Sequence, residues 1–211
     1  MKVCEIFSSI QGESSFAGLP CTFVRLAGCN LRCSYCDTIY AYNEGTDFTE
    51  DEIISRVKRS RIGLVELTGG EPLLQKEVFP LIKRLLDYGY RVLVETNGSI
   101  STAEIDRRAL VILDIKTPGS GMCSKMDFSN LYNIKDTDET KFVITDRKDY
   151  EWSKALISRY KLRKRCHILM SPAYGILQAG DLAKWVLKDR LNVRLNLQLH
   201  KYIYGSGNKG V

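Results

Sequence analysis

Three closely spaced cysteines are the most chemically specific feature of the chain. Cys29, Cys33 and Cys36 form a C-x3-C-x2-C array within the stretch GCNLRCSYCDT. Three thiolates can hold a metal ion or an iron–sulfur cluster and leave one coordination position unfilled. No second CxxC or HxxxH pair follows, so a closed structural zinc site is not expected. A four-iron cluster with one iron open to a further ligand is the favoured interpretation.

Length and composition indicate one soluble α/β domain. The chain has 211 residues, of which 44% are hydrophobic and 27% charged, enough for one core and too few for an elaborated eight-unit barrel. Its seven cysteines lack the spacing of a disulfide framework, and the N-terminus lacks a cleavable apolar leader, so a reducing cytoplasm is expected. No apolar run approaches the length of a membrane span.

The formal net charge of +6 is spread along the chain. The densest basic run is KLRKR at 161–165, which reads most simply as a solvated connection. The charge therefore favours an anionic small substrate or a reductant protein with an acidic face, and no nucleic acid or membrane partner is expected. A basic metal-binding module that grips nucleic acid through KLRKR is the alternative, which lacks interleaved aromatic residues and a second metal half-site.

Strand-like and helix-like segments alternate along the chain. A strand over 21–28 leads into the cysteine loop, and Thr49 with Glu52 predicts a capping box before a helix over 50–60. Further strands are predicted within 64–72, 91–98, 109–121, 140–146, 166–175 and 193–201, with helices around 81–86, 103–109, 150–160 and 182–187. This alternation predicts βαβ crossovers and a parallel sheet. Six such units cannot close a ring, so we expect an incomplete, splayed barrel whose open side a second subunit could cover.

Polar motifs follow several predicted strands, at the sheet edge where the active sites of parallel α/β proteins lie. The glycines of TGGEP at 68–72 allow close backbone approach by a ligand, or form an ordinary tight turn. ETNG at 95–98 and DIKTPGSG at 114–121 bring carboxylates and a lysine to equivalent strand ends, where they can bind hydroxyl and charged groups or satisfy loop backbone.

The cysteine array, with Tyr35 before its last cysteine, resembles that of the radical S-adenosylmethionine (SAM) enzymes, and TGGEP resembles their GGEP motif. This resemblance implies that a 4Fe–4S cluster binds SAM through its unique iron and, once reduced, cleaves it to methionine and a 5′-deoxyadenosyl radical. A glycyl-radical-activating enzyme shares both motifs, and such an enzyme needs an open groove for its protein substrate.

Other stretches are similar to 7-carboxy-7-deazaguanine synthases over nearly the whole chain. They are IQGE at 10–13, Arg25, CDT at 36–38, VETNG at 94–98, DIKTPGSGM at 114–122 and QLHKYI at 198–203. The resemblance implies conversion of 6-carboxy-5,6,7,8-tetrahydropterin to 7-carboxy-7-deazaguanine with loss of ammonia, on the route to queuosine. It also implies a short (β/α)6 radical SAM barrel in one core domain over 1–205, a homodimer, and a flavodoxin- or ferredoxin-type reductant. Residues 206–211 are expected to form a flexible tail.

The same resemblance assigns site residues by matching positions. Those against SAM are Tyr35, Cys36, Asp37, Gly70, Glu71, Glu95, Asp114, Ile115, Lys116, Ser171, Pro172, Ala173 and Tyr174. Those against the substrate are Ile10, Gln11, Gly12, Glu13, Arg25, Thr68 and His200, with the Arg25 guanidinium on the substrate carboxylate. Thr38 matches a Mg²⁺ ligand, although a threonine there would otherwise read as a helix cap. His200 is a candidate proton shuttle, or an edge-strand histidine without catalytic duty.

Overall fold

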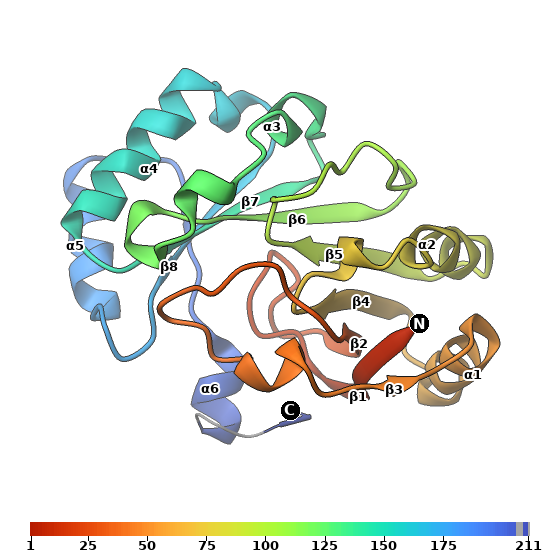
Figure 1. Ribbon diagram of the computed structural model, residues 1–211. Coiled ribbons are helices and arrows are strands. Elements are labelled where there is room, and N and C mark those ends of the chain that lie inside the picture. Colours follow the sequence, from red (N-terminus) through yellow and green to blue (C-terminus); the bar gives the residue numbers. More distant parts are fainter. Residues whose placement is uncertain (206–208, 211) are drawn as a thin grey trace.

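The computed structural model describes residues 1–205, 209 and 210 (Figure 1). Among these residues one sheet has the strand order β3-β1-β2-β4-β5-β6-β7-β8-β9. The strands are β1 (Lys2–Ile10), β2 (Pro20–Leu26), β3 (Thr46–Asp47), β4 (Leu64–Gly69), β5 (Arg91–Thr96), β6 (Leu110–Ile115), β7 (Glu139–Ile144), β8 (His167–Pro172) and β9 (Arg194–Leu195). The helices are α1 (Glu50–Ser60), α2 (Val78–Asp87), α3 (Asn130–Asn133), α4 (Arg147–Arg159), α5 (Ala179–Lys188) and α6 (Leu199–Tyr204). Short 3-10 turns are η1 (Ile39–Tyr42), η2 (Pro72–Leu74), η3 (Pro118–Ser120), η4 (Cys123–Lys125) and η5 (Leu162–Lys164).

The sheet is an open, mostly parallel barrel. Strands β2 and β4 through β9 pair in parallel, whereas β1 pairs antiparallel with both β2 and β3. Strands β3 and β9 form its two edges, so it does not close on itself. The predicted splayed (β/α)6 barrel in a single domain is therefore confirmed, with an antiparallel hairpin before it that the sequence pattern did not show.

The larger core lies between the outer face of the sheet and helices α1, α2, α4 and α5, which follow that face in Figure 1. Helix α1 shows how the sequence sets this up. Thr49 and Glu52 form the predicted capping box, with Thr49 N donating to the Glu52 carboxylate at 2.8 Å. Ile53, Ile54 and Val57 then fall on one helix face and are buried against the sheet. Each such side chain contributes about 1.5–3 kcal/mol to stability.

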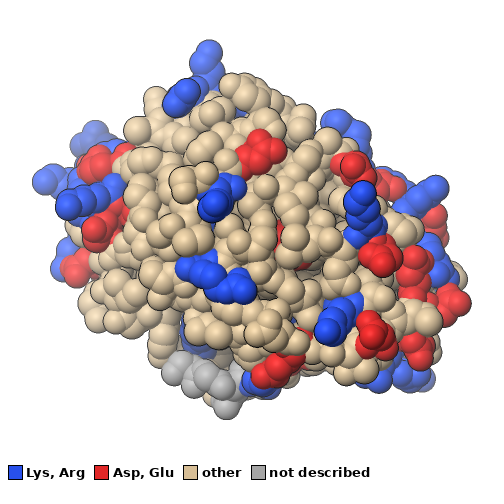
Figure 2. Space-filling view, in the orientation of Figure 1, with Lys and Arg blue, Asp and Glu red and all other residues tan. Residues whose placement is uncertain are grey.

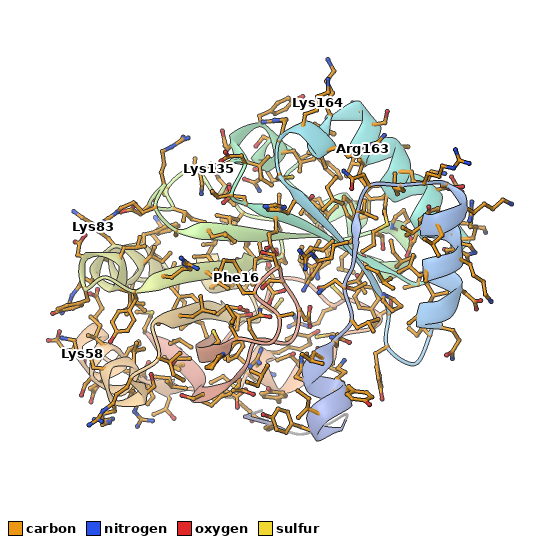
Figure 3. All side chains as sticks on the ribbon, turned by 180° about the vertical axis from the view of Figure 1, so that it is seen from behind. Phe16, Lys58, Lys83, Lys135, Arg163 and Lys164 are labelled. Carbon is orange, nitrogen blue, oxygen red and sulfur yellow. The ribbon has the colours of Figure 1, made fainter. Side chains whose placement is uncertain are left out.

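The inner face has an apolar floor. Phe23, Leu64, Leu93 and Ile112 lie on four neighbouring strands and form a second buried cluster. Phe16 packs on this cluster from the loop between β1 and β2, on the side of the molecule opposite to the view of Figure 1 (Figure 3). The loop therefore covers the floor at the end of the barrel opposite the carboxyl ends of its strands.

Two residues further along these strands the inner face becomes polar. Because side chains alternate between the two faces of a strand, the residues that follow the floor by two positions point the same way. They are Arg25, Glu66, Glu95 and Asp114, and Lys141 stands beside Asp114 in the β6–β7 register. The fold thus gathers charged groups above an apolar base.

Two predicted elements are wrong. Residues 103–109 form turns rather than a helix, because the Asp106 carboxylate accepts from Arg108 N at 3.0 Å, a local bond that competes with helix formation. The strand expected over 193–201 has only Arg194–Leu195, and the chain then leaves the sheet for helix α6. The predicted flexible tail falls largely on residues 206–208 and 211, which lie outside the described residues.

Candidate active site

One cavity of about 320 Å³ opens at the carboxyl ends of the strands. Its volume falls within the roughly 300–1,000 Å³ typical of ligand pockets. All of the predicted site residues line it except Glu71 and Ile115. Residues spread from position 10 to position 200 of the sequence therefore meet in one place.

The cysteine loop is held by backbone contacts on both sides. It starts at Gly28, whose φ of 94° favours glycine and whose N–H donates to Ala41 O at 2.8 Å. On the other side Ser34 N donates to Ser120 O at 3.0 Å, and the Ser34 hydroxyl donates to Gly119 O at 2.9 Å. The loop after β6 thus fixes the segment that carries Cys33 and Cys36.

That loop after β6 is itself tied to the start of α4 by one buried carboxylate. Asp149 accepts from Gly119 N at 2.8 Å, from the Thr117 hydroxyl at 2.9 Å and from the Thr145 hydroxyl at 2.6 Å. A carboxylate that accepts several hydrogen bonds is a strong local anchor. The rigid cradle of the cysteine loop therefore depends on a residue that does not line the cavity.

Gly70 of the GGEP motif brings β4 against the start of the cysteine loop. A Cβ on Gly70 would overlap the carbonyl oxygen of Gly28 and lie 2.7 Å from the Cβ of Cys29. The next residue, Glu71, donates its backbone N–H to Gly28 O at 2.8 Å. The glycine thus allows two backbone segments to approach each other, in addition to the ligand approach inferred from the sequence.

The Glu71 side chain faces away from the cavity. Its carboxylate is fully buried and accepts from Asn97 N at 2.6 Å, the Thr96 hydroxyl at 2.8 Å and Leu73 N at 3.0 Å. Burial raises the pKa of Glu71 to about 7 despite these bonds. Glu71 therefore supports the backbone at Asn97. The side-chain amide of Asn97 in turn points at Cys29 Sγ, 3.9 Å away. Ile115 is likewise buried in the outer core, so its side chain cannot reach a ligand.

The three cysteines suit a cluster better than a single metal ion. All three line the same cavity. Among the described residues, no three His, Cys, Asp or Glu side chains converge on one metal position. A four-iron cluster needs no such convergence because each thiolate binds a separate iron. Burial raises the pKa of the Cys29 and Cys33 thiols, so a metal must hold them as thiolates at neutral pH.

The wall next to the cysteines has unsatisfied polar atoms. Asp114 Oδ2 pairs with Lys116 Nζ at 2.9 Å, but Asp114 Oδ1 is buried without a hydrogen-bond partner in the described structure. The Tyr35 hydroxyl is in the same situation. Buried polar groups are nearly always paired, so these two atoms indicate the polar groups of an absent ligand. Ser171–Tyr174, at the end of β8, completes this wall.

The opposite wall is built from the residues after β1. Gln11 is only 3% exposed, and its side chain is already engaged: Nε2 donates to Glu66 at 2.7 Å and Oε1 accepts from Glu13 N at 2.6 Å. Arg25 enters from β2, where Glu5 binds its Nε at 2.7 Å. Tyr40 shares the same Glu5 oxygen at 2.7 Å. The ion pair holds Arg25 in the wall of the cavity.

Helix α6 forms the rim of the cavity and carries His200. This histidine is not on an edge strand, as one interpretation had it, but in the first turn of a helix. Leu199 N donates to Gly12 O at 2.8 Å, and Lys201 Nζ binds Asp37 Oδ2 at 2.5 Å. The helix therefore ties the loop after β1 to the cysteine loop. Burial raises the pKa of Asp37, but Lys201 lowers it to about 2.

The sequence interpretation missed two buried charged residues of the cavity. Lys141, on β7, contacts Glu13 and Glu95, and Glu66, on β4, is held by Gln11. Each lies inside a mostly apolar strand, Lys141 in ETKFVI and Glu66 in LVELTG. A charged residue inside a parallel strand is costly to bury unless it is paired or bound, and this was the signal that could have found them.

The comparisons with known proteins agree with this geometry. A profile of the radical SAM superfamily matches residues 24–116, which hold the cysteine array and TGGEP. The 7-carboxy-7-deazaguanine synthase of Chlorobaculum tepidum is 46% identical over 100% of this chain and 97% of that protein. That of Koribacter versatilis is 42% identical over the whole of both. The chain belongs to the 7-carboxy-7-deazaguanine synthase family.

Solved structures show the same fold. The crystal structure of QueE from Escherichia coli matches 94% of both chains with a TM-score of 0.78 at 22% identity. SuiB of Streptococcus suis, bound to S-adenosylmethionine, matches 80% of this chain and 44% of that one, with a TM-score of 0.56 at 14% identity. Membership of the synthase family confirms the expected enzyme class, and its radical SAM chemistry confirms a 4Fe–4S cluster and SAM as cofactors.

Proposed function

We propose that this chain converts 6-carboxy-5,6,7,8-tetrahydropterin to 7-carboxy-7-deazaguanine with loss of ammonia, in the route to queuosine and related deazapurines. The observation that carries the proposal is a single cavity with the three cysteines in one wall and the segment after β1, with Arg25, in the other. Relatives of this name match the chain over its full length.

The cysteine wall is proposed to hold the cluster and SAM. When bound, they supply one-electron cleavage of the sulfonium and hence a radical able to abstract hydrogen. The chain supplies position: Asp114 and Lys116 offer an acceptor and a donor to the polar ends of SAM, and the segment from Ser171 to Tyr174 offers backbone edges. Fixed placement is the main requirement, because a misplaced radical attacks the protein.

The opposite wall is proposed to hold the pterin. The Arg25 guanidinium fits the substrate carboxylate, and the Glu13 carboxylate fits the N–H groups of the pterin ring. Burial raises the pKa of Glu13, but Lys141 and His200 lower it to about 2. This acceptor is therefore ionised at all physiological pH values. His200 on the rim is proposed to contact the substrate and to move a proton at its ring nitrogen.

Thr38 is proposed to contribute to a Mg²⁺ site between the two walls. It precedes η1 yet its side chain makes no capping hydrogen bond, so the ordinary helix-cap reading is not what the structure contains. Its hydroxyl lines the cavity and donates to Asp37 Oδ1 at 3.0 Å. A hydroxyl with a neighbouring carboxylate is a hard oxygen environment suited to Mg²⁺ and its waters.

A cytoplasmic homodimer reduced by a flavodoxin- or ferredoxin-type protein is also proposed. Within the described residues, no helix combines the length and hydrophobicity needed to cross a bilayer. The net charge of +6 suits an acidic reductant.

In Figure 2 the lysines and arginines of the displayed face are interspersed with acidic side chains, and in Figure 3 Arg163 and Lys164 of KLRKR lie on η5 at the periphery. On the displayed face this mixture of charges forms no continuous basic groove of the kind that binds nucleic acid.

The test is anaerobic incubation of the reconstituted protein with SAM, a reductant and the tetrahydropterin, with the product identified by mass spectrometry. Formation of 7-carboxy-7-deazaguanine and ammonia is expected for the wild type and for Cys123→Ala, whose thiol lies outside the cavity lining. Cys33→Ala is expected to abolish turnover. SAM cleavage without a deazapurine product would overturn the proposal.

A further inference from the structure

Lys141 occupies an unusual place for a lysine. It lies inside strand β7, is 4% exposed, and reaches the cavity between its two walls. A lysine at such a position must be held by anionic partners, because an unpaired buried ammonium would lose its proton.

Three carboxylates from three different elements surround its ammonium group. Lys141 Nζ lies 2.7 Å from Glu13 Oε2, makes a short contact with Glu95 Oε1, and lies 3.5 Å from Asp114 Oδ2. Glu13 belongs to the loop after β1, Glu95 is on β5, and Asp114 is on β6. These carboxylates would repel one another in a buried site without the cation between them.

The contacts extend from this hub into both walls. On the substrate side, Glu13 Oε1 accepts from Gln198 Nε2 at 2.9 Å, which links it to the segment before α6. Glu95, which is assigned to SAM, accepts through Oε2 from the hydroxyl of Thr68, which is assigned to the substrate, at 3.1 Å. Asp114 is also the partner of Lys116. One ammonium group therefore connects the acceptors of both proposed ligands.

We propose that Lys141 is a positioning residue that fixes Glu13 toward the pterin and Glu95 toward SAM, so that one side chain sets the affinity of both ligands. This inference rests on the proposed function for the identity of the two ligands. Lys141 acts through the carboxylates and takes no part in bond breaking.

The charge of Lys141 is what the positioning depends on. Although burial lowers it, Glu13 and Glu95 raise the pKa of Lys141 well above its ordinary value. Without the cation, burial and the neighbouring acids would raise the pKa of Glu13, and one carboxyl would take up a proton. A protonated Glu13 or Glu95 presents an O–H where the ligand offers its own donor.

The test compares Lys141→Met, Lys141→Arg and Lys135→Met with the wild type, each reconstituted anaerobically. Lys135 is a matched control because it is also paired, to Asp138 at 2.7 Å, and lies outside the cavity lining (Figure 3). Dissociation constants for SAM and for the tetrahydropterin are measured separately by calorimetry. Lys141→Met is expected to weaken both by about tenfold or more, Lys141→Arg by less, and Lys135→Met neither.

A second readout separates this role from simple packing. The charged or titratable groups that face Glu13 are Lys141, His200 and Glu66. In Lys141→Met, pterin binding is expected to improve as the pH rises from 6 to 9, because Glu13 then ionises. Lys141→Arg, which keeps the charge, should retain the wild-type pH dependence. If Lys141 served only to fill space, Lys141→Met would instead bind the pterin better than Lys141→Arg.

The outcomes that overturn the inference differ from those that overturn the function. If the wild type binds both ligands, and Lys141→Met binds SAM or the tetrahydropterin as tightly as the wild type does, the inference fails while the proposed function stands. If the wild type does not bind the tetrahydropterin, the proposed function fails. Should Lys141→Met not fold, Lys141→Gln takes its place, because it also removes the charge from Glu13 and Glu95. It is expected to weaken the binding of both ligands by about tenfold; wild-type affinity for either ligand would overturn the inference.

Discussion

Gly12 lies directly beneath the imidazole of His200. A Cβ on Gly12 would overlap the ring and would lie 2.9 Å from the backbone nitrogen of His200, and the Gly12 carbonyl accepts from Leu199 N at 2.8 Å. The contact joins residues 188 positions apart in the sequence, the difference between 200 and 12. Through it, the loop after β1 and helix α6 form one surface of the cavity.

Gly12→Ala is therefore expected to displace helix α6 and raise the KM for the tetrahydropterin about tenfold, with a smaller effect on the KM for SAM. Gly180→Ala is the matched control, because its Cβ would meet nothing within 4 Å. Steady-state kinetics for both substrates give the comparison. Equal KM values for the wild type and Gly12→Ala would show that α6 does not shape the substrate wall.

Gly70→Ala is expected to disturb the cluster rather than the substrate. The added methyl group would overlap the Gly28 carbonyl and press on Cys29, so the cysteine loop must move. The measurement is iron bound per chain after anaerobic reconstitution, expected to fall by about half or more. Gly63→Ala, whose Cβ would meet nothing within 4 Å, is expected to bind iron normally. Full iron content in Gly70→Ala would contradict the proposed role of this contact.

The buried carboxyl of Glu66 predicts a pH-dependent stability. Burial and then the charge of Glu95 raise the pKa of Glu66 to about 8, from an ordinary value of 4.5. The folded state therefore holds a proton between these pH values that the unfolded state has released. Since the unfolded state binds fewer protons there, the free energy of unfolding falls as the pH rises through this window.

Glu66→Gln cannot ionise and should remove this contribution. At pH 8 the variant is expected to be more stable than the wild type by about 1 kcal/mol or more, with the difference shrinking toward pH 5. Urea unfolding of the reconstituted proteins at both pH values gives the numbers, with the exposed Glu104→Gln as control. An identical pH dependence in the wild type and Glu66→Gln would mean that Glu66 is ionised in the folded protein.

Local sequence signals predicted the elements that rest on local physics. Thr49 and Glu52 interact within one helical turn, so the capping box could be read directly. The parallel strands carry apolar residues on both faces and were found for the same reason. The strand predicted from strict alternation over 193–201 is mostly absent from the sheet. Leu199 N donates instead to Gly12 O, a contact that no local pattern encodes.

The site residues that lie in short, specific motifs were predicted from the sequence. Those whose role depends on partners on other strands were missed. The cysteines and TGGEP are contiguous, so their types and spacing suffice. Lys141 and Glu66 have meaning only through partners on other strands, such as Glu95, that the fold brings next to them. Glu71 lies in a recognisable motif, but its fully buried side chain supports the backbone instead of lining the cavity.

Electron paramagnetic resonance of the reduced, oxygen-free protein with and without SAM tests the central claim most directly. If Cys29, Cys33 and Cys36 hold a four-iron cluster with one open iron, the wild type and Cys166→Ala should contain about four irons per chain and give a cluster signal that shifts when SAM is added. Cys36→Ala should lose that response. Absence of a cluster signal from the wild type, or a signal unchanged by SAM, would contradict the account.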